Sequence, residues 1–312
     1  MFDVIIVGGG PAGLTSAIYT SRAGLSTLVI EKMSLGGQAA MTYKIDNYPG
    51  FKNISGMELA ADFESHVKAS GVKVVMEEAT VFCLDEERKT VTTQSNQYEA
   101  KAVILALGSE RKKLGIPGEK EFSGRGVSYC ATCDGNFFRN RDVAVIGGGN
   151  TAVGDTVALS EICRHVSLVY HGEHLSAIYS LRKQTLERQN VSVLYHQEIC
   201  RILGTDKVER IRVKDSETGA ENDIRVDGVF IDIGMNPNTK LIPKELLLPD
   251  GYVGADENGT TKIPGVFVAG DLRKKQLYQI VTAMSDGANA AYSAQLYLEE
   301  NWVSSVTTNY EQ

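Results

Sequence analysis

Short apolar runs that end at a glycine recur along this chain. Residues 4–7, 102–107, 143–146 and 266–269 form such runs, and each is followed directly by glycine. Continuous apolar runs of this length are typical of strands buried on both faces of a parallel sheet. The pattern predicts an α/β fold in which the glycines mark turns after central strands.

Helices and further strands fill the intervals between these runs. The periodicity predicts a helix over 12–23 and a strand over 27–30, so that strand, turn, helix and strand follow one another at the N-terminus. It also predicts an amphipathic helix over about 56–70, a final helix over about 279–300, and short strands separated by polar turns at 72–75, 80–84, 90–93 and 101–107.

The first glycine turn has the spacing of a dinucleotide-binding fingerprint. Gly8 makes a tight bend, Gly10 lets the backbone approach a pyrophosphate, and Gly13 lets the helix pack closely on the strand. Free amide groups at the start of the helix favour phosphate. Glu31 ends the second strand, where a carboxylate accepts hydrogen bonds from ribose hydroxyls.

Two glycine- and proline-containing segments, 115–118 and 234–238, have the composition of domain boundaries. They predict a larger, discontinuous domain made of residues 1–115 and 240–312. A smaller domain, residues 116–239, is inserted into it and carries a second glycine turn at 147–152.

Composition and charge narrow the class of protein. The chain has 312 residues, 43% hydrophobic and 23% charged, with a formal net charge of −7. This charge gives no general attraction to nucleic acid or to an anionic membrane, although the basic runs 111–113 and 273–275 are candidate local docking positions. No apolar stretch approaches the roughly 18 residues of a membrane span, and we expect a cytoplasmic protein.

The five cysteines fall into two groups. Cys83, Cys163 and Cys200 are isolated among apolar or helical neighbours, which predicts reduced core thiols. Cys130 and Cys133 form a Cys-x-x-Cys pair in a polar, turn-like context, which indicates a redox dithiol. A zinc site is the less favoured alternative, because no second pair exists and the histidines are scattered. Two inert cysteines are the other alternative.

The order of motifs resembles that of the low-molecular-weight thioredoxin reductases over nearly the whole chain. The most specific motif is the Cys-Ala-Thr-Cys-Asp sequence at 130–134, inside a nucleotide-type domain. The other motifs are Gly-Gly-Gln at 36–38, Asn-Tyr-Pro-Gly at 47–50, Gly-Asp at 270–271, and Gln279.

The resemblance implies an α/β, two-domain flavoprotein disulfide reductase fold, with a discontinuous, Rossmann-type FAD-binding domain and an inserted NAD(P)-type domain. It places the FAD pyrophosphate on Gly8, Gly10 and Gly13, and the adenosine ribose on Glu31. It places Gln38, Asn47 and Gln279 at the isoalloxazine ring and Asp271 on the ribityl chain. The remaining positions implied to contact FAD are Ala12, Lys32, Gly37, Gly108, Gly270 and Ile280.

The resemblance also implies the activity. FAD passes two electrons to the disulfide of Cys130 and Cys133, which then reduces thioredoxin, and Asp134 moves a proton in this exchange. The sequence does not assign the cysteine that attacks thioredoxin. The family is homodimeric, and its smaller domain rotates to carry the dithiol from the flavin outward.

The second glycine turn lacks the residues that recognise a nucleotide. Tyr170 stands at the same offset from Gly147 as Glu31 does from Gly8, whereas an NAD site favours an acid there and an NADP site needs arginines nearby. Residues 170–176 contain no arginine, so we expect inefficient use of NADPH and a turn kept as scaffold. A weak, partly protonated substitute from His171 or His174 is the less favoured alternative.

These departures make the chain similar to the pyridine-nucleotide-independent branch of the family, in which reduced ferredoxin delivers the electrons. Tyr278, where many relatives have arginine, is a further departure, and the aromatic tail from Trp302 to Tyr310 either covers the flavin or is a frayed end. An NAD(P)H-dependent thioredoxin reductase with a relaxed nucleotide site is the first alternative. A flavin-binding redox sensor is the second.

Overall fold

The computed structural model of the chain describes residues 1–42, 45, 47–84 and 87–310, with side chains for all of these except 132, 133 and 302–310. Two compact units are present: Met1–Glu110 with Pro237–Gln312, and Arg111–Asn236. The sequence-based boundaries at 115/116 and 239/240 lie a few residues further along the chain. The shift arises because the two connecting segments form short strands that pair with each other, β7 (Ser109–Arg111) and β16 (Met235–Pro237).

The first unit is built on a sheet of seven strands in the order β3-β2-β1-β6-β5-β4, with β17 also paired to β6. β3, β2, β1, β6 and β17 are parallel, and β5 and β4 form an antiparallel extension. The long strand β6 pairs with β5 through its first half and with β17 through its last. The bounds are β1 Phe2–Val7, β2 Thr27–Glu31, β3 Lys73–Met76, β4 Ala79–Cys83, β5 Lys89–Thr93, β6 Gln97–Leu105 and β17 Val266–Val268.

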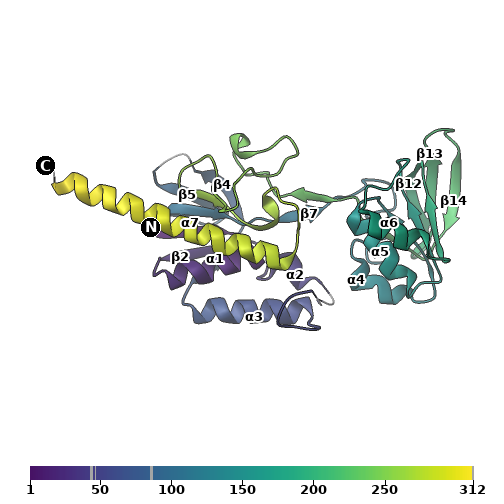
Figure 1. Ribbon diagram of the computed structural model, residues 1–312, viewed down its shortest axis with the longest axis horizontal. Helices are drawn as coiled ribbons and strands as arrows, with labels where there is room; N and C mark the ends of the chain where they lie inside the picture. Colours follow the sequence, from purple (N-terminus) through teal and green to yellow (C-terminus); the bar gives the residue numbers. More distant parts are fainter. Residues whose placement is uncertain (43–44, 46, 85–86, 311–312) are drawn as a thin grey trace. The chain divides into compact units, whose positions relative to one another are not determined.

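Alternate residues of the central strands point to the two faces of this sheet. Val4 and Ile6 pack with the helices α1 (Pro11–Arg22) and α7 (Ile280–Tyr310), which run side by side along one face (Figure 1). Ile5 and Val7 pack on the other face, with residues of the segment that precedes β17. Burial on both faces explains why these strands are continuous apolar runs in the sequence.

The two helices pack closely because small residues line their contact. A Cβ atom on Gly287 would lie 2.2 Å from the carbonyl oxygen of Ala12. Ala290, Ala291 and Ala294 are fully buried in the same contact. Helix α7 continues past residue 300, where the sequence pattern places its end. Helix α3 (Gly56–Ala69) begins at a capping box formed by Ser55 and Glu58, and α2 is the single turn Gly37–Ala40.

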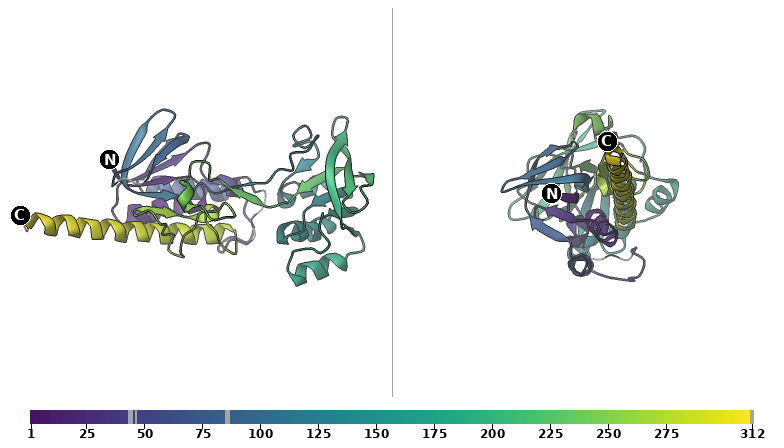
Figure 2. Two further views of the ribbon diagram at one scale, coloured as in Figure 1. Left: turned by 90° about the horizontal axis from the view of Figure 1, so that it is seen from above. Right: turned by 90° about the vertical axis from the view of Figure 1, so that its left-hand side faces the viewer.

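The second unit contains a parallel sheet with the order β11-β10-β9-β15-β8 and an antiparallel sheet with the order β12-β13-β14. The antiparallel sheet packs on one face of the parallel sheet and α5 on the other (Figure 2). The bounds are β8 Val127–Ser128, α4 Ala131–Asp134, β9 Asp142–Ile146, α5 Asn150–Ser160, β10 His165–Val169, α6 Tyr179–Leu186, β11 Val191–Leu194, β12 Gln197–Gly204, β13 Val208–Asp215, β14 Glu221–Arg225 and β15 Gly228–Ile231.

The isolated cysteines are free thiols, but they are not all in a core. Cys163 is buried, and burial raises the pKa of its thiol to about 11. Cys200 is half-buried and Cys83 is exposed, so the prediction of core positions is wrong for Cys83. Its strand, β4, is at an edge of the sheet, where one side is open to solvent. Among the helices that the structure describes, none combines the length and apolar character needed to cross a bilayer.

Candidate functional site

The first glycine turn joins β1 to α1 and requires glycine for steric reasons. Gly8 has φ +114°, and a Cβ atom there would lie 2.2 Å from the carbonyl oxygen of Ala106. A Cβ atom on Gly13 would lie 1.9 Å from the carbonyl oxygen of Gly8. Gly10 precedes the first helical residue, so that free amide groups of α1 face the turn.

Glu31 closes this turn from the end of β2. Its Oε2 accepts a hydrogen bond of 2.7 Å from the backbone N–H of Gly9, and its Oε1 accepts one of 2.9 Å from Met33. The carboxylate is therefore fixed beside the glycine turn, as a ribose-binding acid has to be. Lys32, the next residue, is half-exposed in its side chain and lies 3.8 Å from Glu110.

Two glycines from distant parts of the sequence, Gly37 and Gly270, lie against the same turn. A Cβ atom on Gly37 would be 3.0 Å from the Cα atom of Gly10, and one on Gly270 would be 2.8 Å from the Cβ atom of Ala12. Gly108, after β6, has φ +65°. The backbone thus comes close to the turn at Gly37 and Gly270, and both approaches need glycine.

Of the residues expected at the isoalloxazine ring, Asn47 and Gln279 are in contact, and Gln38 is bound elsewhere. Asn47 donates a hydrogen bond of 2.9 Å from its side-chain amide to Oε1 of Gln279. Gln38 instead donates from its side chain to the carbonyl oxygen of Ser109. Ile280 is the first residue of α7 and packs on a small cluster that includes Ile45.

Asp271 is part of a largely buried charge network. Lys275 Nζ lies 3.2 Å from Asp271 Oδ1 and 3.0 Å from Asp286 Oδ2, and Arg273 Nη2 lies 2.8 Å from Asp286 Oδ1. The backbone N–H of Gly270 also donates to Asp286. Burial raises the pKa of Asp271, against the effect of Lys275.

This network corrects the expectation that residues 273–275 form a basic docking face. The side chains of Arg273 and Lys275 are only 5% and 7% exposed and are paired with acids. Lys274 is exposed but is bound to Asp250. The apparent basic run therefore offers little free positive charge, because two of its three side chains point inward.

The second basic run, 111–113, is also partly occupied. Arg111 Nη1 lies 3.0 Å from Oδ1 of Asp232, whose side chain is 1% exposed. Lys112 and Lys113 are the exposed members of this run.

The redox segment begins directly after β8. Cys130 is disulfide-bonded, and the side chain of Cys133 lies outside the part of the chain that the structure describes. Ser128 links the two ends of the segment: its hydroxyl accepts from the backbone N–H of Cys130 at 3.0 Å and donates to Asp134 Oδ2 at 2.6 Å. The Asp134 carboxylate is thereby held next to the disulfide segment.

Three charged residues form a cluster near this segment; Asp155 and Asp232 were not among the sequence-based candidates, and Arg111 was predicted only as part of a basic docking run. The carboxyl groups of Asp155, in α5, and Asp232, after β15, are hydrogen-bonded to each other, and Asp155 also accepts from the backbone N–H of Ala131. Arg111 is bound to Asp232. An acid directly after the apolar run 228–231 was the available signal, since Asp271 stands in a similar position after β17.

The second glycine turn keeps its backbone shape but is covered by the chain itself. Gly147 has φ +139°, as the turn requires. The ring of Tyr170 lies against Gly148, where a Cβ atom would be 2.4 Å from the ring. Ser176 Oγ donates to the Gly148 carbonyl oxygen at 3.1 Å, and the N–H of Ile178 donates to Asn150 Oδ1 at 2.8 Å.

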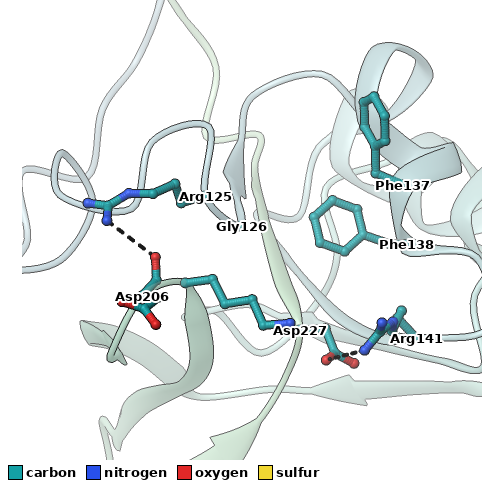
Figure 3. Close-up of a pocket in the computed structure, with 8 residues that line it drawn as sticks. Arg125, Gly126, Phe137, Phe138, Arg141, Asp206 and Asp227 are labelled. Atoms are coloured by element: carbon teal, nitrogen blue, oxygen red, sulfur yellow. Dashed lines mark hydrogen bonds and ion pairs between the residues drawn. The ribbon is translucent and has the colours of Figure 1, made fainter.

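A cavity of about 260 Å³ lies in the same unit (Figure 3). Phe137 is one of the lining residues; it is 82% exposed and lies three positions beyond Asp134. Arg125 donates to the carbonyl oxygen of Asp206 at 3.3 Å. The lining residues are Arg125, Gly126, Phe137, Phe138, Arg141, Asp206, Lys207 and Asp227.

Comparison with known proteins identifies the family. The family described as pyridine nucleotide-disulphide oxidoreductase matches residues 2–287. The thioredoxin reductase of Bacillus subtilis (strain 168) is 44% identical over 304 residues, which cover 96% of each chain. The chain belongs to the low-molecular-weight thioredoxin reductase family. The α/β flavoprotein fold predicted from the sequence is confirmed.

Solved structures agree with membership of the thioredoxin reductase family. The crystal structure of Lactococcus lactis thioredoxin reductase has a TM-score of 0.84 and 34% identity, and covers 96% of this chain and 100% of that one. A ferredoxin-flavin thioredoxin reductase from Clostridium acetobutylicum has a TM-score of 0.53 and 30% identity, and covers 96% and 98%. These comparisons do not support the ferredoxin-dependent branch, nor the expectation of inefficient use of NADPH.

Proposed function

We propose that this chain is an FAD-dependent thioredoxin-disulfide reductase. The observation that carries the proposal is the Cys130 disulfide, with Asp134 held beside it by Ser128, inside a chain whose relatives are thioredoxin reductases. The alternative of a redox sensor predicts no turnover with thioredoxin.

The residues of the first unit fit FAD. The free amide groups at the start of α1 face the glycine turn, and Glu31 is fixed where the adenosine ribose would bind. Asn47 and Gln279 would hold the isoalloxazine ring, and Asp271 the ribityl chain. When bound, FAD supplies the capacity to store two electrons and release them together.

The chain's own chemistry then takes place at the dithiol. Two electrons and two protons convert the Cys130 disulfide to two thiols, and a thiolate attacks the disulfide of thioredoxin. Asp134 is the proposed proton carrier, because its carboxylate is linked through Ser128 to the backbone of Cys130. Thioredoxin leaves with two thiols, and the disulfide of Cys130 forms again.

The surface around Phe137 is the proposed docking site for thioredoxin. An aromatic side chain with 82% of its area exposed, so close in sequence to the dithiol, is unusual for a surface without a partner. Beside it, the cavity of Figure 3 is lined by charged residues of both signs, Arg125, Arg141, Lys207, Asp206 and Asp227. Such a surface fits a protein that brings its own disulfide to Cys130.

The proposed electron donor is NADH or NADPH, with little discrimination between them. The relatives named thioredoxin reductase support a nicotinamide donor better than ferredoxin. The second glycine turn keeps the φ angle that a dinucleotide-binding turn needs. Because residues 170–176 contain no arginine, the 2′-phosphate of NADPH adds little affinity.

Ferredoxin is the second candidate donor, and one observation favours it. The Tyr170 ring lies on Gly148, in the turn that would have to receive the nucleotide, and Ser176 is bound to the same residue. Ferredoxins are usually acidic, and Lys112 and Lys113 remain as exposed basic residues for docking. The buried partners of Arg273 and Lys275 weaken this candidate.

The assembly that we propose is a homodimer. We also propose that the connecting strands β7 and β16 act as the hinge of a domain rotation. Dimerisation is tested by light scattering, and rotation by trapping a disulfide-linked complex with thioredoxin.

The test of the proposed function is steady-state reduction of thioredoxin with three donors compared: NADPH, NADH and reduced ferredoxin. We expect turnover with both nucleotides, with kcat/KM values within about tenfold of each other, since one charge-assisted contact contributes about 1.5 to 3 kcal/mol when present. Turnover with ferredoxin alone would establish the second candidate. Absence of turnover with all three donors would refute the proposal.

A further inference from the structure

Two carboxyl groups, those of Asp155 and Asp232, meet in the second unit, and one oxygen of Asp232 has no donor among the described residues. The side chain of Asp232 is 1% exposed, and its Oδ1 is bound to Arg111 at 3.0 Å. Its Oδ2 is buried, and no N–H or neutral hydroxyl donor of the described residues reaches it. The carboxyl of Asp155 is the neighbouring acid of the Asp232 side chain.

A hydrogen bond between two carboxyl groups requires a proton on one of them, because an ionised carboxylate only accepts. Burial raises the pKa of Asp232 to about 8, and the charge of Asp155 acts in the same direction, while Arg111 opposes both. Burial also raises the pKa of Asp155. The pair therefore holds one proton at neutral pH and titrates as a unit.

This pair is in direct contact with the redox segment. Asp155 accepts a hydrogen bond from the backbone N–H of Ala131, which is the amide that follows Cys130. A carboxylate charge thus lies beside the peptide bond that joins Cys130 to Ala131. Negative charge at this place opposes formation of a thiolate.

We propose that Asp155 and Asp232 share one proton, and that loss of this proton in alkaline solution makes the dithiol harder to ionise. The two acids are positioning residues that act on the sulfur through charge. This inference deepens the proposed function, since it rests on a dithiol that is reduced and oxidised in turnover.

Other charged groups near Asp155 and Asp232 also contribute to the electrostatic potential at the pair. Arg111 comes from β7, Asp134 from α4, and Lys112 lies beside Gly234 after β15. They do not supply the missing donor to Asp232 Oδ2. Replacing Asp232 by Asn leaves one carboxyl group and an amide that donates to it, so that no more than one negative charge is present in alkaline solution.

The experiment measures the rate of alkylation of the dithiol as a function of pH. The FAD-loaded protein is reduced with dithiothreitol, desalted under argon and treated with iodoacetamide, and the peptide that contains Cys130 is quantified by mass spectrometry. Below pH 7 the wild type and Asp232→Asn should agree. Above pH 8 the thiolate titration of Asp232→Asn should lie about half a unit to one unit lower, the shift expected of one nearby charge.

The control is Asp223→Asn, which removes the same charge from the exposed strand β14 of the same unit. It should leave the titration unchanged. If Asp232→Asn does not fold, Asp155→Asn carries the test, since it also leaves a single carboxyl. Titrations of the wild type and the variant that coincide at all pH values, or an equal shift in the control, would overturn the proposal. The alkylation experiment does not measure thioredoxin turnover. Failure of the proposal on the acid pair is therefore distinguishable from failure of the proposed function.

Discussion

Asn47 donates a hydrogen bond of 2.9 Å to the side-chain carbonyl of Gln279, although the two residues are 232 positions apart in the sequence. Asn47 belongs to the loop before α3, and Gln279 directly precedes α7. Both residues are exposed to solvent in the structure. A contact between exposed side chains from such distant segments contributes little to stability and is more informative about binding.

Replacing Gln279 by Ala should weaken FAD binding while leaving the fold intact. We expect a rise of roughly threefold to tenfold in the dissociation constant of FAD, which corresponds to one hydrogen bond of about 1 kcal/mol. Fluorescence titration of the deflavinated protein with FAD measures this. The control is Gln276→Ala, an exposed glutamine in the same segment. Equal affinities in both variants would contradict the assignment of Gln279.

Replacing Asp286 by Asn should destabilise the first unit strongly. Arg273 and Lys275 would lose their shared buried partner: Lys275 would keep Asp271, but Arg273 would keep only the exposed Glu257, and breaking a buried ion pair costs about 3 kcal/mol or more. Denaturant unfolding measures the free energy of unfolding. Lys274→Ala is the matched control, because its ion pair with Asp250 is exposed and should contribute less than about 1 kcal/mol. Similar losses in the two variants would show that the network is not the stabilising element.

The stability of the protein should depend on pH through Asp232. The pKa of this group in the folded state is about 8, above the usual 3.8 of an aspartate side chain, so the folded state binds the proton more tightly. Its contribution is fully present below about pH 4 and is lost as the pH rises through 8. The melting temperature of the wild type should therefore fall relative to that of Asp232→Asn between pH 5 and pH 8. If the melting temperatures of the wild type and of Asp232→Asn change equally with pH across this range, the buried acid pair is contradicted.

Replacing Phe137 by Ala should impair the use of thioredoxin without impairing the flavin. Loss of a central aromatic contact commonly costs 2 kcal/mol or more, so KM for thioredoxin should rise by about tenfold or more while kcat changes little. Tyr179→Ala provides the control, since this side chain of the same unit is 72% exposed and lies on α6. An unchanged KM in the Phe137 variant would place the docking surface elsewhere.

The apolar runs were sufficient to predict the parallel strands β1, β2, β9 and β17, because strands buried on both faces carry a continuous pattern. The antiparallel sheet β12-β13-β14 was not predicted, since its strands are half-exposed and their polar positions obscure the pattern. The position of Glu31 beside the glycine turn followed from motif spacing alone. The hydrogen bond from the Gly9 N–H to the Glu31 carboxylate shows that the two residues lie side by side, as the spacing predicts.

Contacts between charged residues that are far apart in the sequence could not be predicted from the sequence pattern. Arg273 and Lys275 appear there as a basic surface, and only the fold brings Asp286 of α7 against them. The pair of Asp155 and Asp232 likewise depends on α5 and the end of β15 meeting in space. Asp232 has a sequence signal, because it directly follows an apolar run, but its partners and its charge environment are defined only by the fold.

The central claim, that electrons leave the flavin through the disulfide of Cys130, is tested most directly by a single turnover without oxygen. The FAD-loaded protein is reduced photochemically under argon and mixed with one equivalent of oxidised thioredoxin, and flavin absorbance and thioredoxin thiols are followed together. In the wild type we predict that the flavin reoxidises as thioredoxin thiols appear, whereas in Cys130→Ser the flavin stays reduced. Reoxidation of the flavin with formation of thioredoxin thiols in Cys130→Ser would contradict this electron path.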